Sequence, residues 1–433
     1  MTFQTVEQLL TRFKGLGAVR VFCKRLAEND NSKQQIYLGG KFEVLTFFPH
    51  GEITAHSTLS APNFKAPLAL FWVTADGMER AEGAQLILYP AYPEVRLSGF
   101  LKGCKSAPSE YLRPIPREHR HGADGRVLVF GTTAEGHTLA CLAPAGSPLA
   151  NEIRHKFEAA QPDGLFFELT LPLGSQNNRA LVLNALRQIH LGGFHESCRR
   201  TSEGKVMPYT ARNGGGYTLE ALLGINPNSR SEPDYLGWEI KAHSSSRITL
   251  MTPEPNGGFY GEKGAKAFVE RYGHPVEDRG MYFTGNHQIG IPAQRTGLTL
   301  EVSGFDPVTA KVSDVAGVVR LVDSSGVDVA SWGFAQLLGH WNRKHAFAAY
   351  MRYSPRPSPL SYRYETPVLM GEHTDFSRFL GGLSQGSIIF DPGTKVLNAG
   401  TPKSTVKARS QFRIAVKDLG MLYQKFSVEK LAP

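Results

Sequence analysis

Hydrophobic positions alternate with polar ones along most of the first third of the chain. Between Val19 and Ala143, short stretches rich in Val, Ile, Phe, Tyr and Thr are separated by Gly, Pro, Asn and Asp. Because alternation of period two is typical of strands, we expect strands at residues 19–26, 34–38, 41–48, 67–75, 84–90, 126–133 and 137–143. Helices are expected at Val6–Phe13 and near Asn151–Ala159. This pattern favours an all-β barrel or sandwich with a helix at each end.

The pattern changes after about residue 157. Apolar residues recur at helical spacing from residue 178 onward until Gly192–Gly193, which is a helix stop signal. Helical and strand patterns then mix to the end of the chain. The Gly- and Pro-rich segments 204–216, 252–264 and 353–363 are expected to be surface loops. The predicted organisation is a β domain at 1–157, a linker at 158–175 and an α/β domain at 176–433.

Composition narrows the class of protein. With 433 residues, of which 41% are hydrophobic and 20% charged, the chain is globular rather than disordered. A net charge of +9 suits a polyanionic partner. The four cysteines are scattered without metal-binding spacing, which argues against a disulfide scaffold or a zinc module. No apolar run is long enough for a signal peptide or a membrane span, so we expect a soluble, cytoplasmic protein.

One short segment carries the candidate chemistry. Pro233–Asp234 is followed by Glu239, Ile240 and Lys241 on a predicted strand, where alternation places Glu239 and Lys241 on the same face. A tight turn between them would bring Asp234 beside Glu239. Two converging carboxylates form a hard oxygen site for Mg²⁺, which lowers the pKa of a bound water. This is the PD-(D/E)xK pattern of metal-dependent phosphodiesterases, although the spacing alone also fits a solvated strand face with an ion pair.

Further motifs stand around this segment in a fixed order. They are Gly192–Glu196 (GGFHE), Gly216–Leu223 (GYTLEALL), Pro233–Tyr235 (PDY) and Glu239–His243 (EIKAH). Together they resemble the MvaI/BcnI restriction endonucleases, relatives of the mismatch-repair nicking enzyme MutH. The resemblance implies an α/β PD-(D/E)xK nuclease fold for the C-terminal domain and site-specific cleavage of DNA.

The resemblance also implies roles for matching positions. Asp234 and Glu239 would hold Mg²⁺, with Mn²⁺ able to substitute, and the main-chain carbonyl of Ile240 would be a further ligand. Lys241 would activate or position the attacking water. Glu220 would lie at the edge of the metal site.

Three further polar residues match positions of the family motifs, but the resemblance gives them no step in the reaction. They are His195, Glu196 and His243. His195 is also placed to cap the preceding helix. His243 either contacts a DNA phosphate or packs beside the site.

Basic residues of the C-terminal domain are candidates for DNA contacts. In the family a base-reading loop precedes an F-R-I motif, and Phe412–Ile414 stands here, so Arg413 is the candidate for contacting bases. Phosphate contact is the alternative. The further candidates are Lys407 and Arg409 nearby, and Arg199, Arg200 and Arg212 in a segment at 198–215 that we expect to be a loop draped over the DNA backbone.

The N-terminal domain carries a second, shorter resemblance. Phe22–Asp30 resembles the opening of the effector domain of EcoRII-type restriction enzymes, which is a DNA-binding pseudobarrel. A purely structural or oligomerisation barrel is the alternative. The resemblance implies DNA contacts from Lys24, Arg25, Asn29, Arg96, Lys102 and Lys105.

The combination of the two domains resembles monomeric type IIE restriction enzymes, in which one chain binds two DNA sites. We therefore expect Mg²⁺-dependent cleavage of both strands of a short, GC-rich, near-palindromic DNA site, leaving 5′-phosphate ends. The expected partners are double-stranded DNA, at one or two sites, and a cognate DNA methyltransferase as genetic partner. Two alternatives remain: a MutH-like strand-specific or methylation-dependent nickase or endonuclease, and a DNA-binding regulator with an inactive nuclease domain.

Overall fold

The structure is a computed structural model of the whole chain. It describes residues 3–31, 34–120, 125–158, 165–169, 178–211, 213–226, 234–277 and 280–431. The chain divides into two compact units, Met1–Gln176 and Asn177–Pro433, and each is described by itself. None of the helices among the described residues is long and apolar enough to cross a lipid bilayer.

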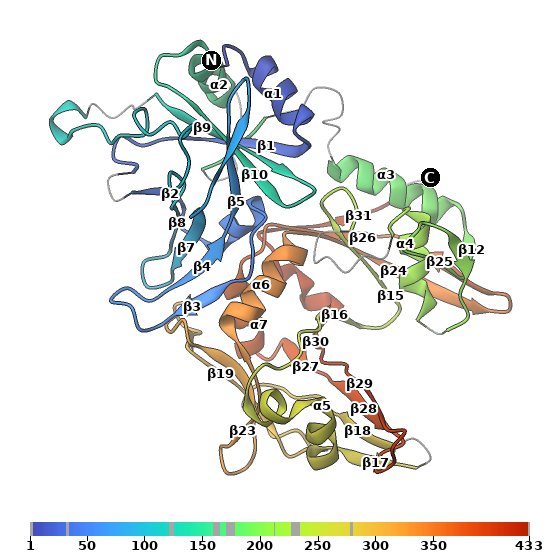
Figure 1. Cartoon of the computed structure of the whole chain (residues 1–433). Coiled ribbons are helices and arrows are strands. Elements are labelled where there is room, and N and C mark those ends of the chain that lie inside the picture. The colour runs from blue at the N-terminus through green and yellow to red at the C-terminus, as the bar shows by residue number, and fades with distance from the viewer. Residues whose placement is uncertain are drawn as a thin grey trace. The chain divides into compact units, whose positions relative to one another are not determined.

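The N-terminal unit consists of two sheets and two α-helices (Figure 1). The helices are α1 (Val6–Gly15) and α2 (Pro148–Glu158), with short 3-10 turns η1 (Phe42–Phe47) and η2 (Arg117–His119). One sheet has the order β11 (Phe167–Glu168), β1 (Ala18–Arg25), β9 (Val127–Thr133), β10 (His137–Ala143), β5 (Ala69–Val73), β6 (Met78–Ala81). The other has the order β2 (Gln35–Gly39), β8 (Glu94–Ser98), β7 (Gln85–Tyr89), β4 (Asn63–Pro67), β3 (Thr54–His56).

The predicted sheet-rich unit with a helix at each end is confirmed. α1 and α2 bury their apolar faces against β1, β9 and β10 in one core, where Leu9, Phe13 and Ile153 are fully enclosed. The N–H of Val6 also donates to Glu152 of α2 at 2.8 Å. Helices α1 and α2 therefore cover the first sheet together.

One strand prediction for this unit was wrong. The strand predicted at 41–48 is instead the 3-10 turn η1 (Phe42–Phe47), whose tight turns bury Phe42, Val44, Leu45 and Phe47. Within the predicted linker at 158–175, Phe167 and Glu168 form β11, which pairs with β1. Residues 159–164 and 170–175 of that linker lie outside the described residues.

The C-terminal unit mixes helices and sheets. Its helices are α3 (Asn178–Leu191), α4 (Gly214–Leu222), α5 (Gly258–Tyr272), α6 (Phe334–His345) and α7 (Phe376–Ser384), with the 3-10 turn η3 (Val416–Leu422). The site lies on a sheet with the order β12 (Phe194–Glu196), β25 (Leu360–Tyr364), β24 (Phe347–Pro357), β26 (Val368–Glu372), β31 (Lys425–Glu429), and β15 (Glu239–His243) also pairs with β24.

Smaller sheets complete this unit. They are β13 (Cys198–Arg200) with β14 (Val206–Pro208); β16 (Arg247–Met251), β30 (Phe412–Ala415) and β27 (Ile388–Phe390); β17 (His274–Val276), β18 (Gly280–Thr284), β28 (Gly393–Leu397) and β29 (Thr405–Lys407); β19 (Thr299–Ser303), β22 (Val318–Val322) and β23 (Asp328–Gly333); and β20 (Phe305–Asp306) with β21 (Lys311–Val312).

The predicted helix at 178–191 is confirmed as α3, and it packs with α4 on the sheet that carries β15. Leu186 of α3, Leu219 of α4 and Ile240 of β15 belong to one buried apolar cluster. β15 runs parallel to β24, with Ile240 opposite Ala349. Ile240 thus points into the core, and the side chains on either side of it point away from the core.

Three segments predicted as loops are partly regular. Residues 198–208 form the β13–β14 hairpin, and α4 begins at Gly214, within the segment 204–216. α5 begins at Gly258, and residues 353–363 lie in the β24–β25 hairpin. Glycine is common in turns, but here several glycines, among them Gly214, Gly215 and Gly258, stand where other parts of the chain approach closely.

Gly215 tests this explanation. A Cβ atom at Gly215 would lie 2.3 Å from the Tyr353 ring, whereas a Cβ at the adjacent Gly216 would meet nothing within 4 Å. Gly215→Ala should therefore lower the free energy of unfolding by about 1–3 kcal/mol, and Gly216→Ala should raise it by roughly 0.5–1 kcal/mol. Urea denaturation followed by tryptophan fluorescence measures both. Equal effects of the two substitutions would contradict the packing argument.

Candidate active site

A tight turn places Asp234 against β15. Tyr235 and Trp238 exchange two main-chain hydrogen bonds of 3.0 and 2.9 Å, and the residues between them, Leu236 and Gly237, have φ of 52° and 82°. Positive φ at both central residues is the mark of a type I′ turn, for which glycine is favoured. The chain thereby reverses, and the main-chain N–H of Ile240 donates to Asp234 Oδ2 at 3.0 Å.

Glu239 and Lys241 share the face of β15 that points away from the core, as predicted. Lys241 Nζ donates to Glu239 Oε1 at 2.9 Å, and the Glu239 side chain is only 4% exposed. Lys344, at the end of α6, brings a second ammonium 3.8 Å from the same oxygen. Burial alone would raise the pKa of Glu239, but the charges of Lys241 and Lys344 lower it below the ordinary value. Glu239 is therefore held ionised.

Two further carboxylates face Glu239. Burial, followed by the charge of Glu239, raises the pKa of Asp234 to about 6. Burial and the charges of Asp234 and Glu239 raise the pKa of Glu220, on α4, to about 7. The structure therefore brings together Glu220, Asp234, Glu239 and Lys241, from two elements and a turn, as one acidic site with a lysine.

This acidic site fits a divalent cation in one specific respect. Glu239 Oε2 is buried and has no hydrogen-bond partner among the described residues, and a buried carboxylate oxygen without a partner is costly. No group of three His, Cys, Asp or Glu side chains within the described ranges is arranged as a metal cage. The ligand set expected from the sequence is two carboxylates and a main-chain carbonyl. It uses only two such side chains and so would not form a group of three. Since the N–H and C=O of a strand residue point to the same side, the Ile240 carbonyl faces the Asp234 side of β15.

The structure gives His195 a structural contact. His195 Nε2 lies 2.8 Å from the carbonyl oxygen of Ile189, in the last turn of α3, which confirms the capping interpretation. Gly192 leaves room for this ring, because a Cβ there would lie 2.7 Å from it. Glu196 is exposed on β12.

His243 ends β15. It is half-buried, and its Nδ1 lies 3.2 Å from the Ser245 carbonyl oxygen. Burial lowers its pKa, and the nearby Arg352 adds to that shift.

The predicted DNA contacts of the C-terminal unit lie in different environments. Arg413 is held in an ion pair with Asp391 at 2.6 Å and donates to the Arg247 carbonyl oxygen at 3.2 Å. Lys407 and Arg409 are exposed. On β13, Arg199 lies over the Tyr209 ring, with 5.5 Å to its centroid, and Arg200 donates to Asn226 at 2.7 Å. Arg212 and Pro233 lie outside the described residues.

Among the predicted contacts of the N-terminal unit, Lys24 needs correction. Its ammonium is buried and forms an ion pair of 2.7 Å with the equally buried Asp30, so it stabilises the strand–loop junction and does not reach DNA. Arg96 forms an ion pair of 2.7 Å with Glu94, which engages part of its guanidinium group. The remaining predicted contacts are exposed: Arg25, Asn29, Lys102 and Lys105.

Comparison with known proteins assigns this site to a class. The sequence model of the MvaI/BcnI restriction endonuclease family matches residues 183–423, which include every residue of the acidic site. The protein is therefore a site-specific deoxyribonuclease. It belongs to the MvaI/BcnI restriction endonuclease family and is a type II restriction enzyme.

Solved structures of MvaI were also compared with the chain. MvaI in complex with cognate DNA substrate is similar to it with a TM-score of 0.46 and 18% identity, over 59% of this chain and 99% of MvaI. MvaI in the absence of DNA is similar to the chain with a TM-score of 0.33 and 16% identity, over 59% of this chain and 98% of MvaI. No curated protein sequence matches the chain.

Lys344 is the residue that sequence reasoning missed. It belongs to no motif, and only the folding of α6 against the β15–β24 sheet brings it near Glu239. Its charge opposes the mutual repulsion of the three carboxylates, because it lowers the pKa of each of them. We assign it a positioning role for Glu239.

Removing this charge should slow cleavage. Lys344→Ala should reduce the rate of DNA cleavage by about 10-fold or more, since preorganised charges at reaction centres contribute at this scale, while Lys344→Arg should restore most of it. Single-turnover cleavage of plasmid DNA measures the rates. A Lys344→Ala enzyme as fast as the wild type, or an equally slow Lys344→Arg enzyme, would contradict the role.

Proposed function

We propose that the protein is a Mg²⁺-dependent restriction endonuclease of type IIE, which cuts both strands of a short, GC-rich, near-palindromic DNA site and leaves 5′-phosphate and 3′-hydroxyl ends. The single observation that supports the chemistry is Glu239 Oε2, which is buried beside Asp234 and Lys241 and has no hydrogen-bond partner in the described part of the chain. Family membership supports the substrate. In a cell, a cognate DNA methyltransferase would protect the host sequence.

Each residue of the acidic site has a separate proposed role. Asp234, Glu239 and the Ile240 carbonyl would hold Mg²⁺, and Mn²⁺ would be able to substitute. A bound divalent ion supplies Lewis-acid charge and lowers the pKa of water. Lys241 would position the attacking water, since its ammonium lies 2.9 Å from Glu239 Oε1 and its side chain is 19% exposed. Glu220 would sit at the edge of the ion site.

Lys241→Ala tests the chemical assignment. It should abolish cleavage of unmethylated phage DNA in Mg²⁺, because the group that positions water is lost, while DNA binding persists because the carboxylates and the basic surfaces remain. Gel electrophoresis of the digest and a mobility-shift assay measure the two properties. Lys266→Ala, which removes an exposed ammonium on α5, is the control and should cut like the wild type. Cleavage by Lys241→Ala would refute the active-site assignment.

We further propose that the N-terminal unit is an effector domain that binds a second DNA site, as in UbaLAI, a monomeric type IIE enzyme that the chain resembles. The proposal is supported by the sequence at residues 22–30 and by the exposure of Arg25, Asn29, Lys102 and Lys105. A second bound site raises the local concentration of DNA at the catalytic unit. One chain would then suffice for activity.

This arrangement predicts activation in trans. A short duplex that contains the target site should stimulate cleavage of a one-site plasmid several-fold, and Arg25→Ala with Lys102→Ala should lower that stimulation. Lys156→Ala, on α2, is the matched control. The ratio of cleavage rates with and without the duplex is the measurement. An unchanged ratio in the double variant, or no stimulation of the wild type, would contradict the effector proposal.

A further inference from the structure

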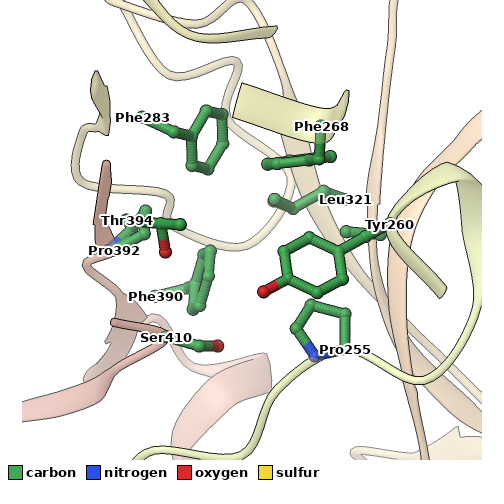
Figure 2. A pocket seen from close by; sticks show the side chains of 10 residues that line it. Pro255, Tyr260, Phe268, Phe283, Leu321, Phe390, Pro392, Thr394 and Ser410 are labelled. Carbon is green, nitrogen blue, oxygen red and sulfur yellow. The ribbon is translucent and has the colours of Figure 1, made fainter. Parts of the chain in front are cut away.

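The sheet formed by β17, β18, β28 and β29 has two faces of opposite character. On its inner face, Phe283 packs against Phe268 of α5 with 4.7 Å between ring centroids. Phe283 and Thr394 point into an apolar pocket, as Figure 2 shows. Because side chains alternate along a strand, the neighbours Tyr282 and Lys395 belong to the outer face. This alternation defines an outer face that α5 leaves uncovered.

A row of polar side chains crosses that outer face. The strand register places His274 opposite Tyr282, Tyr282 opposite Lys395, and Lys395 opposite Lys407. Residues directly opposite each other in antiparallel strands lie on the same face. The Lys395 ammonium lies over the Tyr282 ring, with 5.3 Å to the centroid. The row therefore presents two lysines and an aromatic ring together.

Two arginines lie beside the next residue pair on the same face, which is Thr284 and Gly393. Thr284 pairs with Gly393, and Arg295 Nη1 donates to Thr284 Oγ1 at 2.9 Å. Arg409 follows the end of β29; its carbonyl oxygen accepts from the Gly393 N–H at 2.8 Å, and a Cβ at Gly393 would meet its Cδ at 3.0 Å. The outer face thus carries four cationic side chains: Lys395, Lys407, Arg295 and Arg409. None of the four forms an ion pair with an acidic side chain within the described ranges of the chain.

Arg295 sits on a loop that the fold holds rigidly. His287 is fully buried, exchanges two main-chain hydrogen bonds of 2.8 and 3.0 Å with Phe390, and contacts Thr296 Oγ1 through Nε2 at 2.8 Å. Gly290 and Ala293 donate to the carbonyl oxygens of Leu300 and Leu298 at 2.9 Å. On this frame, Asn286, Gln294 and Arg295 are exposed. His287 therefore anchors this loop.

We propose that duplex DNA lies on this outer face, where Arg295 and Asn286 read base edges while Lys395 and Lys407 contact phosphates. The proposal rests on the proposed function and adds specificity-determining residues to it. Positive charge without acidic partners matches the DNA backbone. Arginine suits guanine and asparagine suits adenine in the major groove.

The difference between the two kinds of contact follows from rigidity. Base reading needs a donor fork held in one orientation, and the Thr284 hydrogen bond fixes one Nη atom of Arg295 while its other N–H groups stay available. Lysines on a strand edge carry a point charge on a flexible stem and suit phosphates. Arg295 should therefore discriminate between sequences, whereas Lys395 and Lys407 should not.

The test compares variants of the full chain on the DNA that the wild type cuts. Arg295→Ala and Asn286→Ala should each weaken binding to the cut sequence about 5- to 150-fold, the range of one good base contact, and should relax the cleaved sequence at one base pair when fragment ends are sequenced. Arg295→Lys should behave like Arg295→Ala, because it keeps the charge and loses the fork. Lys395→Ala and Lys407→Ala should weaken binding to all sequences alike and make the salt slope shallower by about one each.

Lys263→Ala is the matched control, because it removes an exposed lysine from α5, on the opposite side of the same sheet. It should bind and cut like the wild type, and thermal unfolding confirms that every variant is folded. Unchanged specificity of Arg295→Ala, or equal weakening on all sequences, would overturn the inference while the proposed function stands. If the wild type cuts no DNA, the proposed function fails, and unchanged affinity of the variants for duplex DNA would overturn the inference separately.

Discussion

The site depends on one hydrogen bond, from the main-chain N–H of Ile240 to Asp234 Oδ2 at 3.0 Å. It closes the type I′ turn onto β15 and brings a carboxylate from outside the strand to a carboxylate on it. β15 in turn is fixed by its parallel pairing with β24 and by Ile240 in the core. The position of the reactive groups is thus set by main-chain geometry together with this one contact to the Asp234 side chain.

The electrostatics of the site follow from this placement. Burial and the closeness of the three carboxylates raise the pKa of Asp234 and Glu220, while the charges of two lysines keep the buried Glu239 ionised. Such a cluster is unfavourable by itself, because like charges repel and the buried Glu239 Oε2 has no hydrogen-bond partner within the described ranges. Strain of this kind is typical of functional sites. A cation brought in with the DNA would offset it.

Sequence reasoning found the elements whose signals are local. The alternation at 239–243 identified the strand, the spacing at 178–191 identified α3, and ordered motifs around Glu239 identified the family. It missed what depends on contacts between distant segments. Lys344 comes from a distant helix, and Gly214 and Gly215 lie inside α4, where Tyr362 and Tyr353 pack against them. Lys24 looked like a DNA contact because burial in an ion pair leaves no mark in the sequence.

The most direct test of the account is to digest unmethylated phage DNA with the wild-type protein in Mg²⁺ and to sequence the fragment ends. The account predicts discrete fragments whose 5′-phosphorylated ends share one short sequence. Fragments with random ends, or no cleavage in either Mg²⁺ or Mn²⁺ on methylated or unmethylated DNA, would contradict it.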